Sequence, residues 1–391
     1  MNTKTVTLPD SPAAGTRNQG IELLRIAATL VIITQHILTQ GGVLYEAAEN
    51  INYVNYSLAY LLKNLTHWGS TVFALISGYL CIRSRYRVSS LLRVWLETVF
   101  YTVLFTAVFA LVQPETVDAK LWVGAFFPVI NRKYWYITAY AALFLMMPLL
   151  NAGIHALPRR TLTLSLLAAV VLFCALPPFT TQDSFSFNSG YSPWWLAFMY
   201  VVGAYVRLYG EERLQNVKSR WLWLTLGLCA FLTWVLQPLL ILLDFFPSLR
   251  WLSDYLSDRA AALQVRTSIT LMLLAVCVFL LFLRARPPRW AEKPVKFLSA
   301  HSLGVYLIHV HPLLFATAYY LFAPLAHLPA PLLLLAVPAA AVGVFALCTL
   351  LDTLRAALFR VLRADALADR LAGVLARLGD RLAGVLDGKS E

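Results

Sequence analysis

The sequence has little charge, since Asp, Glu, Lys and Arg make up only 13% of its 391 residues. Soluble domains carry roughly 25%. It also lacks a long polar linker that would divide a chain of this length into soluble domains. Hydrophobic residues reach 59% and recur in apolar stretches from one end to the other. We therefore predict an all-α fold, a polytopic transmembrane bundle of about ten helices followed by a C-terminal amphipathic cytoplasmic helix.

Several patterns that would indicate other functions are missing. The net charge of +12 is spread over short basic clusters between apolar segments, so we predict no nucleic-acid partner. The five cysteines are far apart and form no CxxC or zinc spacing, which favours buried reduced thiols. The histidines show no HExxH or comparable spacing, so we predict no metal site. The first apolar segment lacks a signal-peptide cleavage site and is read as a retained helix.

Apolar stretches of about 20 residues define the predicted spans. They lie near 21–40, 61–82, 91–112, 134–154, 161–179, 192–209, 220–243, 263–284, 297–322 and 331–354. The segment 113–133 is expected to add a short interfacial helix. The predicted domains are a cytoplasmic N-terminal tail at 1–20, an integral membrane domain at 21–355, and an amphipathic C-terminal helix and tail at 356–391.

Orientation follows from the loops. Lys and Arg gather after the second, fourth, sixth, eighth and tenth spans, whereas the alternate loops are poorer in them. The positive-inside rule then places both termini in the cytoplasm. In the C-terminal segment, Asp369–Leu375 (DRLAGVL) repeats at Asp380–Leu386, eleven residues on, with apolar residues at helical spacing. A helix on the membrane surface is favoured, and a homo-oligomer formed through this helix is the second interpretation.

Ionisable residues inside apolar spans are costly, so each suggests a function. The first span contains Glu22, Arg25 and His36. Arg25 and His36 are eleven residues apart, which brings them within roughly 20° of one helix face and about 16 Å apart along the axis. Glu22 and Arg25, three residues apart, are expected to form an ion pair. The structural alternative is that Arg25 reaches the headgroups and His36 is a satisfied polar residue of the bundle.

Four segments in this order resemble the membrane acyltransferase-3 family. Arg25 and His36 match its R-X10-H motif, and Phe73–Leu80 (FALISGYL) resembles its Ser-Gly motif, which arginines follow. Lys133–Asn151 resembles its Trp-containing middle span, and Leu298–Leu314 resembles its late span, in which a Tyr precedes a His. Within that family it resembles the members that O-acetylate bacterial surface polysaccharides, such as the enterobacterial common antigen enzyme.

The resemblance implies an enzyme of the bacterial inner (cytoplasmic) membrane with its acyltransferase domain at 21–355. It would move an acetyl group from cytoplasmic acetyl-CoA to a hydroxyl of a surface or lipid-linked glycan. It assigns catalysis to Arg25 and His36 and acetyl-CoA binding to the arginines after the Ser-Gly motif. Candidates for acetyl-CoA binding are Arg83, Arg85 and Arg93. The substrate-binding or supporting positions are Glu22, Ser77, Gly78, Trp135, Tyr306 and His309. The chain departs from the family pattern at Glu22, where many members carry Asp.

The chemistry of these residue types suits the implied reaction. Attack of a hydroxyl on a thioester needs a base and stabilisation of the developing oxyanion. A neutral imidazole is a suitable base, so we predict that His36 takes the proton, with a transient acetyl-His36 as the alternative. Arginines suit the phosphates of CoA, although Arg83, Arg85 and Arg93 could instead be topological anchors.

Other readings of these residues stay open. Ser77 and Gly78 could serve helix packing alone. Trp135 could belong to the aromatic belt at the membrane interface or stack on a sugar. His311, which precedes Pro312, is expected to satisfy backbone groups freed by a kink. The competing functions for the whole chain are a flippase-like glycan or lipid transporter and a non-catalytic membrane partner. The sequence does not identify the acceptor.

Overall fold

The computed structural model describes residues 18–50, 52–180, 182–210 and 216–386. Most of the predicted N-terminal tail and the last five residues lie outside these ranges. Within them the regular structure is helical and no strand occurs, which confirms the all-α fold.

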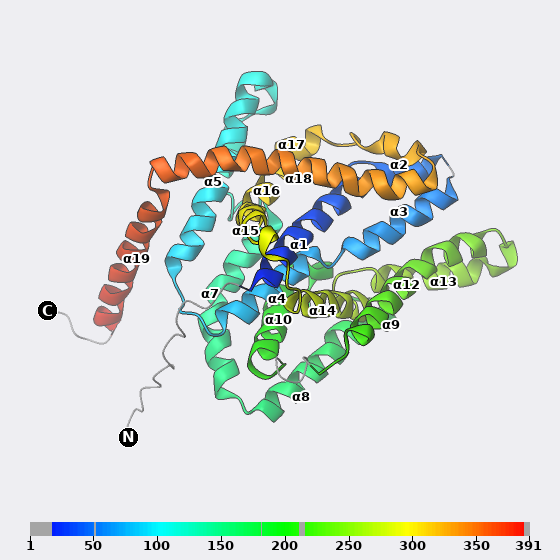
Figure 1. Ribbon diagram of the computed structural model, residues 1–391, viewed down its shortest axis with the longest axis horizontal. Helices are drawn as coiled ribbons and strands as arrows, with labels where there is room; N and C mark the ends of the chain where they lie inside the picture. The colour runs from blue at the N-terminus through cyan, green and yellow to red at the C-terminus, as the bar shows by residue number, and fades with distance from the viewer. Residues whose placement is uncertain (1–17, 51, 181, 211–215, 387–391) are drawn as a thin grey trace.

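The helices form a bundle with α1 (Gln19–Leu38) running through its middle (Figure 1). The helices that precede the 180–191 loop are α2 (Val43–Glu49), α3 (Tyr53–Thr66), α4 (Gly69–Cys81), α5 (Val88–Val112), α6 (Ala119–Phe126), α7 (Trp135–Ala156), α8 (Arg159–Val170) and α9 (Pro177–Thr180). Those that follow are α10 (Pro193–Tyr205), α12 (Ser219–Asp244), α13 (Arg250–Leu263), α14 (Ile269–Leu283), α15 (Glu292–Ala300), α16 (Ser302–His309), α17 (Pro312–Thr317), α18 (Ala330–Val361) and α19 (Ala364–Leu386).

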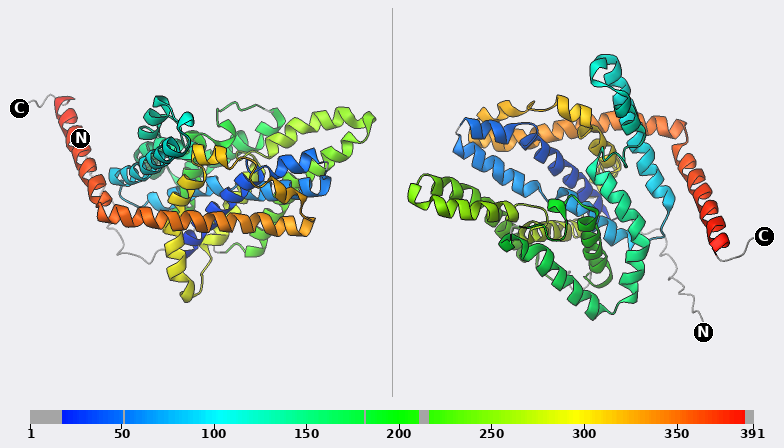
Figure 2. Two further views of the ribbon diagram at one scale, coloured as in Figure 1. Left: turned by 90° about the horizontal axis from the view of Figure 1, so that it is seen from above. Right: turned by 180° about the vertical axis from the view of Figure 1, so that it is seen from behind.

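The peripheral helices give the molecule its outline. The long helix α18 runs along one side of the bundle, and α19 turns away from its end toward the C-terminus (Figures 1 and 2). The helices α12 and α13 pack against each other as a hairpin that projects away from the bundle (Figure 1). The short helix α6 lies in the segment where an interfacial helix was expected. The central helix α1 contacts α18, α15, α4 and α3, so its side chains are surrounded by protein.

Six helical stretches among the described residues are long and apolar enough to cross a membrane. They are Gln19–Glu49, Val88–Val112, Trp135–Ala156, Arg159–Thr180, Ser219–Asp244 and Ala330–Val361. The prediction of a multi-pass membrane protein is therefore confirmed. The number of ten spans stays a prediction, because the expected spans at 61–82 and 297–322 are each divided into shorter helices.

The break between α16 and α17 has a local cause. Pro312 has no backbone N–H and stands at the first position of α17, where that donor is not needed. The Nδ1 atom of His311 accepts a hydrogen bond from the backbone N–H of Leu313 at 3.3 Å. The expectation that His311 satisfies backbone groups at this kink is confirmed.

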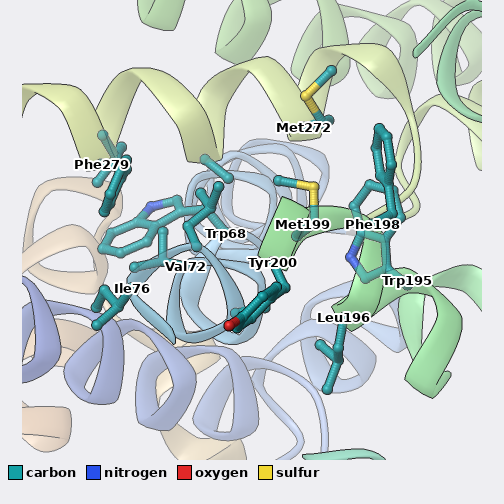
Figure 3. Close-up of a cluster of buried hydrophobic side chains, with 14 of the residues drawn as sticks. Trp68, Val72, Ile76, Trp195, Leu196, Phe198, Met199, Tyr200, Met272 and Phe279 are labelled. Carbon is teal, nitrogen blue, oxygen red and sulfur yellow. The ribbon is translucent and has the colours of Figure 1, made fainter. Parts of the chain in front are cut away.

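The largest buried cluster joins α4, α10 and α14 (Figure 3). In Figure 3, Val72 and Ile76 of α4 lie on the side of Phe279 of α14, and Met199 and Tyr200 of α10 lie on the other side of α4. Burial of large apolar side chains stabilises such a cluster through dispersion contacts and packing density. This cluster fixes α4, which carries Ser77 and Gly78, against its neighbours.

Glycines allow α4 and α10 to approach closely. A Cβ atom at Gly78 would lie 1.9 Å from the carbonyl oxygen of Tyr200, and one at Gly203 would lie 2.1 Å from that of Leu75. Because both obstacles are backbone atoms, neither could move without separating the two helices. Gly78 therefore serves close helix packing, as small residues do in membrane bundles.

Replacing Gly78 with alanine is expected to lower the free energy of unfolding by about 1–3 kcal/mol, the usual cost of overpacking. The matched control is Gly343→Ala, since nothing lies within 4 Å of a Cβ atom at Gly343 in α18. Thermal unfolding of both variants in the same detergent would compare them. Equal midpoints for Gly78→Ala and the wild type would contradict the close-packing role.

A buried network of charged and polar side chains joins α18 to its neighbours. The carboxylate of Asp352, whose relative exposure is 0%, accepts hydrogen bonds from Tyr101 of α5 at 2.6 Å and from Arg355 at 2.8 and 2.9 Å. Nδ1 of His301 lies 2.5 Å from Oδ2 of Asp352, which also accepts one of the bonds from Arg355. Arg355 also pairs with Glu97 of α5 at 3.2 Å. The network therefore ties α5 and the start of α16 to α18.

Candidate active site

Helix α1 positions the two residues predicted to be catalytic. The side chain of Asn18 caps the helix by accepting hydrogen bonds from the first backbone N–H groups. Nη1 of Arg25 lies 3.2 Å from Oε1 of Glu22, so the predicted ion pair is confirmed. The hydroxyl of Ser299 donates a hydrogen bond to the same carboxylate of Glu22. These contacts hold Arg25 at the N-terminal end of α1.

A cavity of about 460 Å³ extends along α1, and we call it the inner cavity. Arg25 and His36 both line it, as their eleven-residue spacing predicts. The predicted site residues that line it are Glu22, Arg25, His36, Ser77, Trp135 and Tyr306. Small-molecule sites usually measure roughly 300–1,000 Å³, so the inner cavity has the size of a ligand site.

His36 lies at the far end of the inner cavity, and His309, which lines neither cavity, packs behind it. The ring centroids of His36 and His309 are 5.4 Å apart. Nδ1 of His309 lies 2.7 Å from the carbonyl oxygen of Val305, so this nitrogen carries the proton and donates the bond. Nε2 of His309 and Nδ1 of His36 are buried and have no hydrogen-bond partner. Because buried polar atoms are normally paired, the free nitrogen of His36, which lines the cavity, marks a place where a substrate can bond.

Aromatic side chains form the wall opposite α1. The ring centroids of Trp135 and Tyr191 are 4.6 Å apart, and those of Tyr136 and Tyr306 are 6.2 Å apart. The Tyr306 ring also lies 6.1 Å from that of His309. Trp135 therefore stands in the cavity wall, a position in which it can contact a ligand.

A second cavity of about 340 Å³ lies toward the C-terminal end of α1, and we call it the outer cavity. Thr39, Lys63 and Gln264 line it, and none of them lines the inner cavity. The residues that border both cavities are Gln35, His36, Tyr191 and Arg266. His36 therefore stands where the two cavities meet.

The arginines predicted to bind acetyl-CoA do not line either cavity. Arg83 and Arg85 are exposed in the loop between α4 and α5. The guanidinium of Arg93 is paired with Asp365 and Asp369 of α19, each at 2.9 Å. In this structure Arg93 holds the C-terminal helix against α5, and its role in donor binding stays a prediction.

Sequence reasoning missed three buried ionisable residues. Arg266, Glu97 and Asp352 all lie inside the predicted spans, so the criterion that selected Arg25 and His36 applied to them as well. Arg266 borders both cavities, whereas Glu97 and Asp352 belong to the buried network. Among the described residues no group of three or more His, Cys, Asp or Glu side chains is arranged to hold a metal ion.

Comparison with known proteins identifies the family to which the chain belongs. The family model described as an acyltransferase domain, that of the acyltransferase-3 family, matches residues 18–353. No curated protein and no solved structure compared with the chain matches it. The finer resemblance to the enterobacterial common antigen enzyme therefore stays a prediction. The match spans most of the chain and includes both cavities, so this multi-pass membrane protein belongs to the acyltransferase-3 family.

Proposed function

We propose that this protein transfers an acetyl group from cytoplasmic acetyl-CoA to a hydroxyl of a surface or lipid-linked glycan. The observation that carries the proposal is the position of His36, which borders both the inner and the outer cavity. A donor entering from one side and an acceptor entering from the other would meet at one imidazole. Acyl transfer across a membrane requires such a meeting point, because CoA stays on one face and the glycan on the other.

The inner cavity suits the donor. Arg25 supplies a cation at its end near the N-terminus of α1, the end predicted to face the cytoplasm. Apolar and aromatic walls beyond Arg25 suit the neutral arm that carries the thioester. Val94 of α5 lines this cavity, and the exposed Arg83 and Arg85 precede α5 in the chain. These two arginines remain our candidates for contacts with the CoA phosphates outside the cavity.

The proposed reaction uses His36 as the base. Its imidazole accepts the proton of the acceptor hydroxyl while the hydroxyl oxygen attacks the thioester carbonyl carbon. A C–O bond forms, the oxyanion of the tetrahedral intermediate collapses, and the C–S bond breaks. The CoA thiolate leaves and takes the proton from the imidazolium of His36. The ring of His309 packs beside that of His36 and lines neither cavity, so it can position the His36 imidazole from behind.

Acetyl-CoA binding and turnover by the purified protein in nanodiscs test the proposal. We expect the wild type to bind acetyl-CoA, to hydrolyse it slowly, and to transfer labelled acetyl to a bacterial lipid-linked glycan fraction. Arg25→Ala is expected to weaken acetyl-CoA binding at least about tenfold, because charge-assisted contacts are strong in a partly buried site. A wild-type protein that binds no acetyl-CoA would overturn the proposal of acetyl-CoA as donor and favour a transport function for the two cavities.

A further inference from the structure

The outer cavity is bordered by cations and by no acid. Lys63 and Arg266 line it, and no Asp or Glu among the described residues does. The other polar groups around it are neutral, and they include Gln35, Gln40 and Gln264. A concave site with this charge attracts anions, and the protein walls around it strengthen the attraction by excluding water. The inner cavity differs in its lining, which includes the carboxylate of Glu22 as well as Arg25 and Arg266.

Arg266 is buried, and within the described part of the chain no counter-charge lies beside it. Its relative exposure is 8%, and its Nε atom is buried with no hydrogen-bond partner. The guanidinium carbon lies 4.1 Å from the ring centroid of Tyr191 and 5.8 Å from that of Trp135. No carboxylate among the described residues pairs with it. A buried charge needs a partner, and the aromatic faces supply only part of the stabilisation that an anion would give.

The fold holds Arg266 in this place. The segment between α13 and α14 is fixed on one side by Gln264, whose carbonyl oxygen lies 2.9 Å from Nδ1 of the buried His67. On the other side the hydroxyl of Ser268 caps α14 by accepting a hydrogen bond from the N–H of Leu271 at 3.3 Å. Arg266 is therefore held between two anchored residues.

The turn opposite this segment is shaped to receive Arg266. Gly190 has φ +93°, and a Cβ atom there would lie 2.7 Å from Cβ of Arg266. Only glycine combines this left-handed backbone with such a close approach at little cost. The guanidinium therefore has a defined site at the boundary of the two cavities.

We infer that the outer cavity selects an acceptor sugar carrying an anionic group, a phosphate or a carboxylate, which Arg266 and Lys63 bind beside His36. The inference rests on the proposed function, since it assigns the outer cavity to the acceptor. Arg266 offers paired N–H donors that match either anion, and Lys63, which lines the same cavity, adds a second charge. A phosphate would come from a sugar joined to its carrier, and a carboxylate from an acidic sugar of the glycan.

Equilibrium binding of three sugars to the full-length protein in phosphatidylcholine nanodiscs tests this inference. The probes are glucose 1-phosphate, methyl glucuronoside and the neutral methyl glucoside. We expect at least one charged sugar to bind about tenfold or more tightly than the neutral one, and its identity names the anion. Lys63→Gln and Arg266→Gln should each remove most of this preference for the charged sugar over the neutral one. Arg266→Lys, which keeps the charge, should retain part of it.

The controls separate this inference from the proposed function. Lys120→Gln removes an exposed lysine of α6 that lines neither cavity, and it should keep the full preference. If Arg266→Gln does not fold, Lys63→Gln and Arg266→Lys still report on the site. Equal affinities for all three sugars, or a full preference that survives in both Lys63→Gln and Arg266→Gln, would overturn the inference. Acetyl-CoA turnover by the same wild-type preparation reports separately on the proposed function.

Discussion

Replacing His36 with alanine is expected to reduce kcat for acetyl transfer by about 10²–10⁴-fold, the usual contribution of a positioned general base. The dissociation constant of acetyl-CoA should change little, because Arg25 and the aromatic wall of the inner cavity remain. The loss arises because no other residue borders both cavities with an imidazole nitrogen free of hydrogen bonds, among the residues described. Measurements of labelled acetyl transfer and of donor binding on one preparation would separate the two effects.

The matched control is His155→Ala, since His155 is exposed at the end of α7 and lines neither cavity. It should retain wild-type rates. Full acetylation of the glycan by His36→Ala would rule out both direct base catalysis and an acetyl-His36 intermediate. Rapid quenching of the wild type with labelled acetyl-CoA distinguishes these two routes, because only the covalent route leaves acetyl on the protein.

Replacing Arg355 with methionine is expected to cost about 3–5 kcal/mol of unfolding free energy, the effect of breaking a buried ion pair from one side. The variant would leave the carboxylates of Asp352 and Glu97 buried without their shared cation. Their side-chain exposures are 0% and 13%, so water compensates them poorly. Thermal unfolding in detergent and equilibrium unfolding by denaturant would both report the loss.

Two further variants sharpen this prediction. Arg360→Met removes an exposed arginine five residues further along α18 and should leave stability nearly unchanged. Adding Glu97→Gln to Arg355→Met removes one of the two uncompensated charges and should recover part of the loss. Wild-type stability of Arg355→Met would mean that the network contributes nothing to the fold.

Features set by local periodicity could be predicted from the sequence. The apolar stretches predicted the helices that begin near Gln19, Val88, Trp135, Ser219 and Ala330, because lipid requires each backbone to satisfy its own hydrogen bonds. The points at which predicted spans are interrupted depended instead on tertiary contacts that the sequence does not record. The expected span at 61–82 is divided at His67, whose ring is engaged with the carbonyl oxygen of Gln264 far along the chain.

For the candidate site, the sequence by itself determined that Arg25 and His36 share one face of one helix, because helical geometry alone sets that relation. It also determined the pairing of Glu22 with Arg25, which are one helical turn apart. Only the tertiary structure decided that Arg266, 230 residues after His36 in the numbering, borders the same two cavities. The physical reason is that such cavities form between helices distant in the chain, and no local pattern records which helices will pack together.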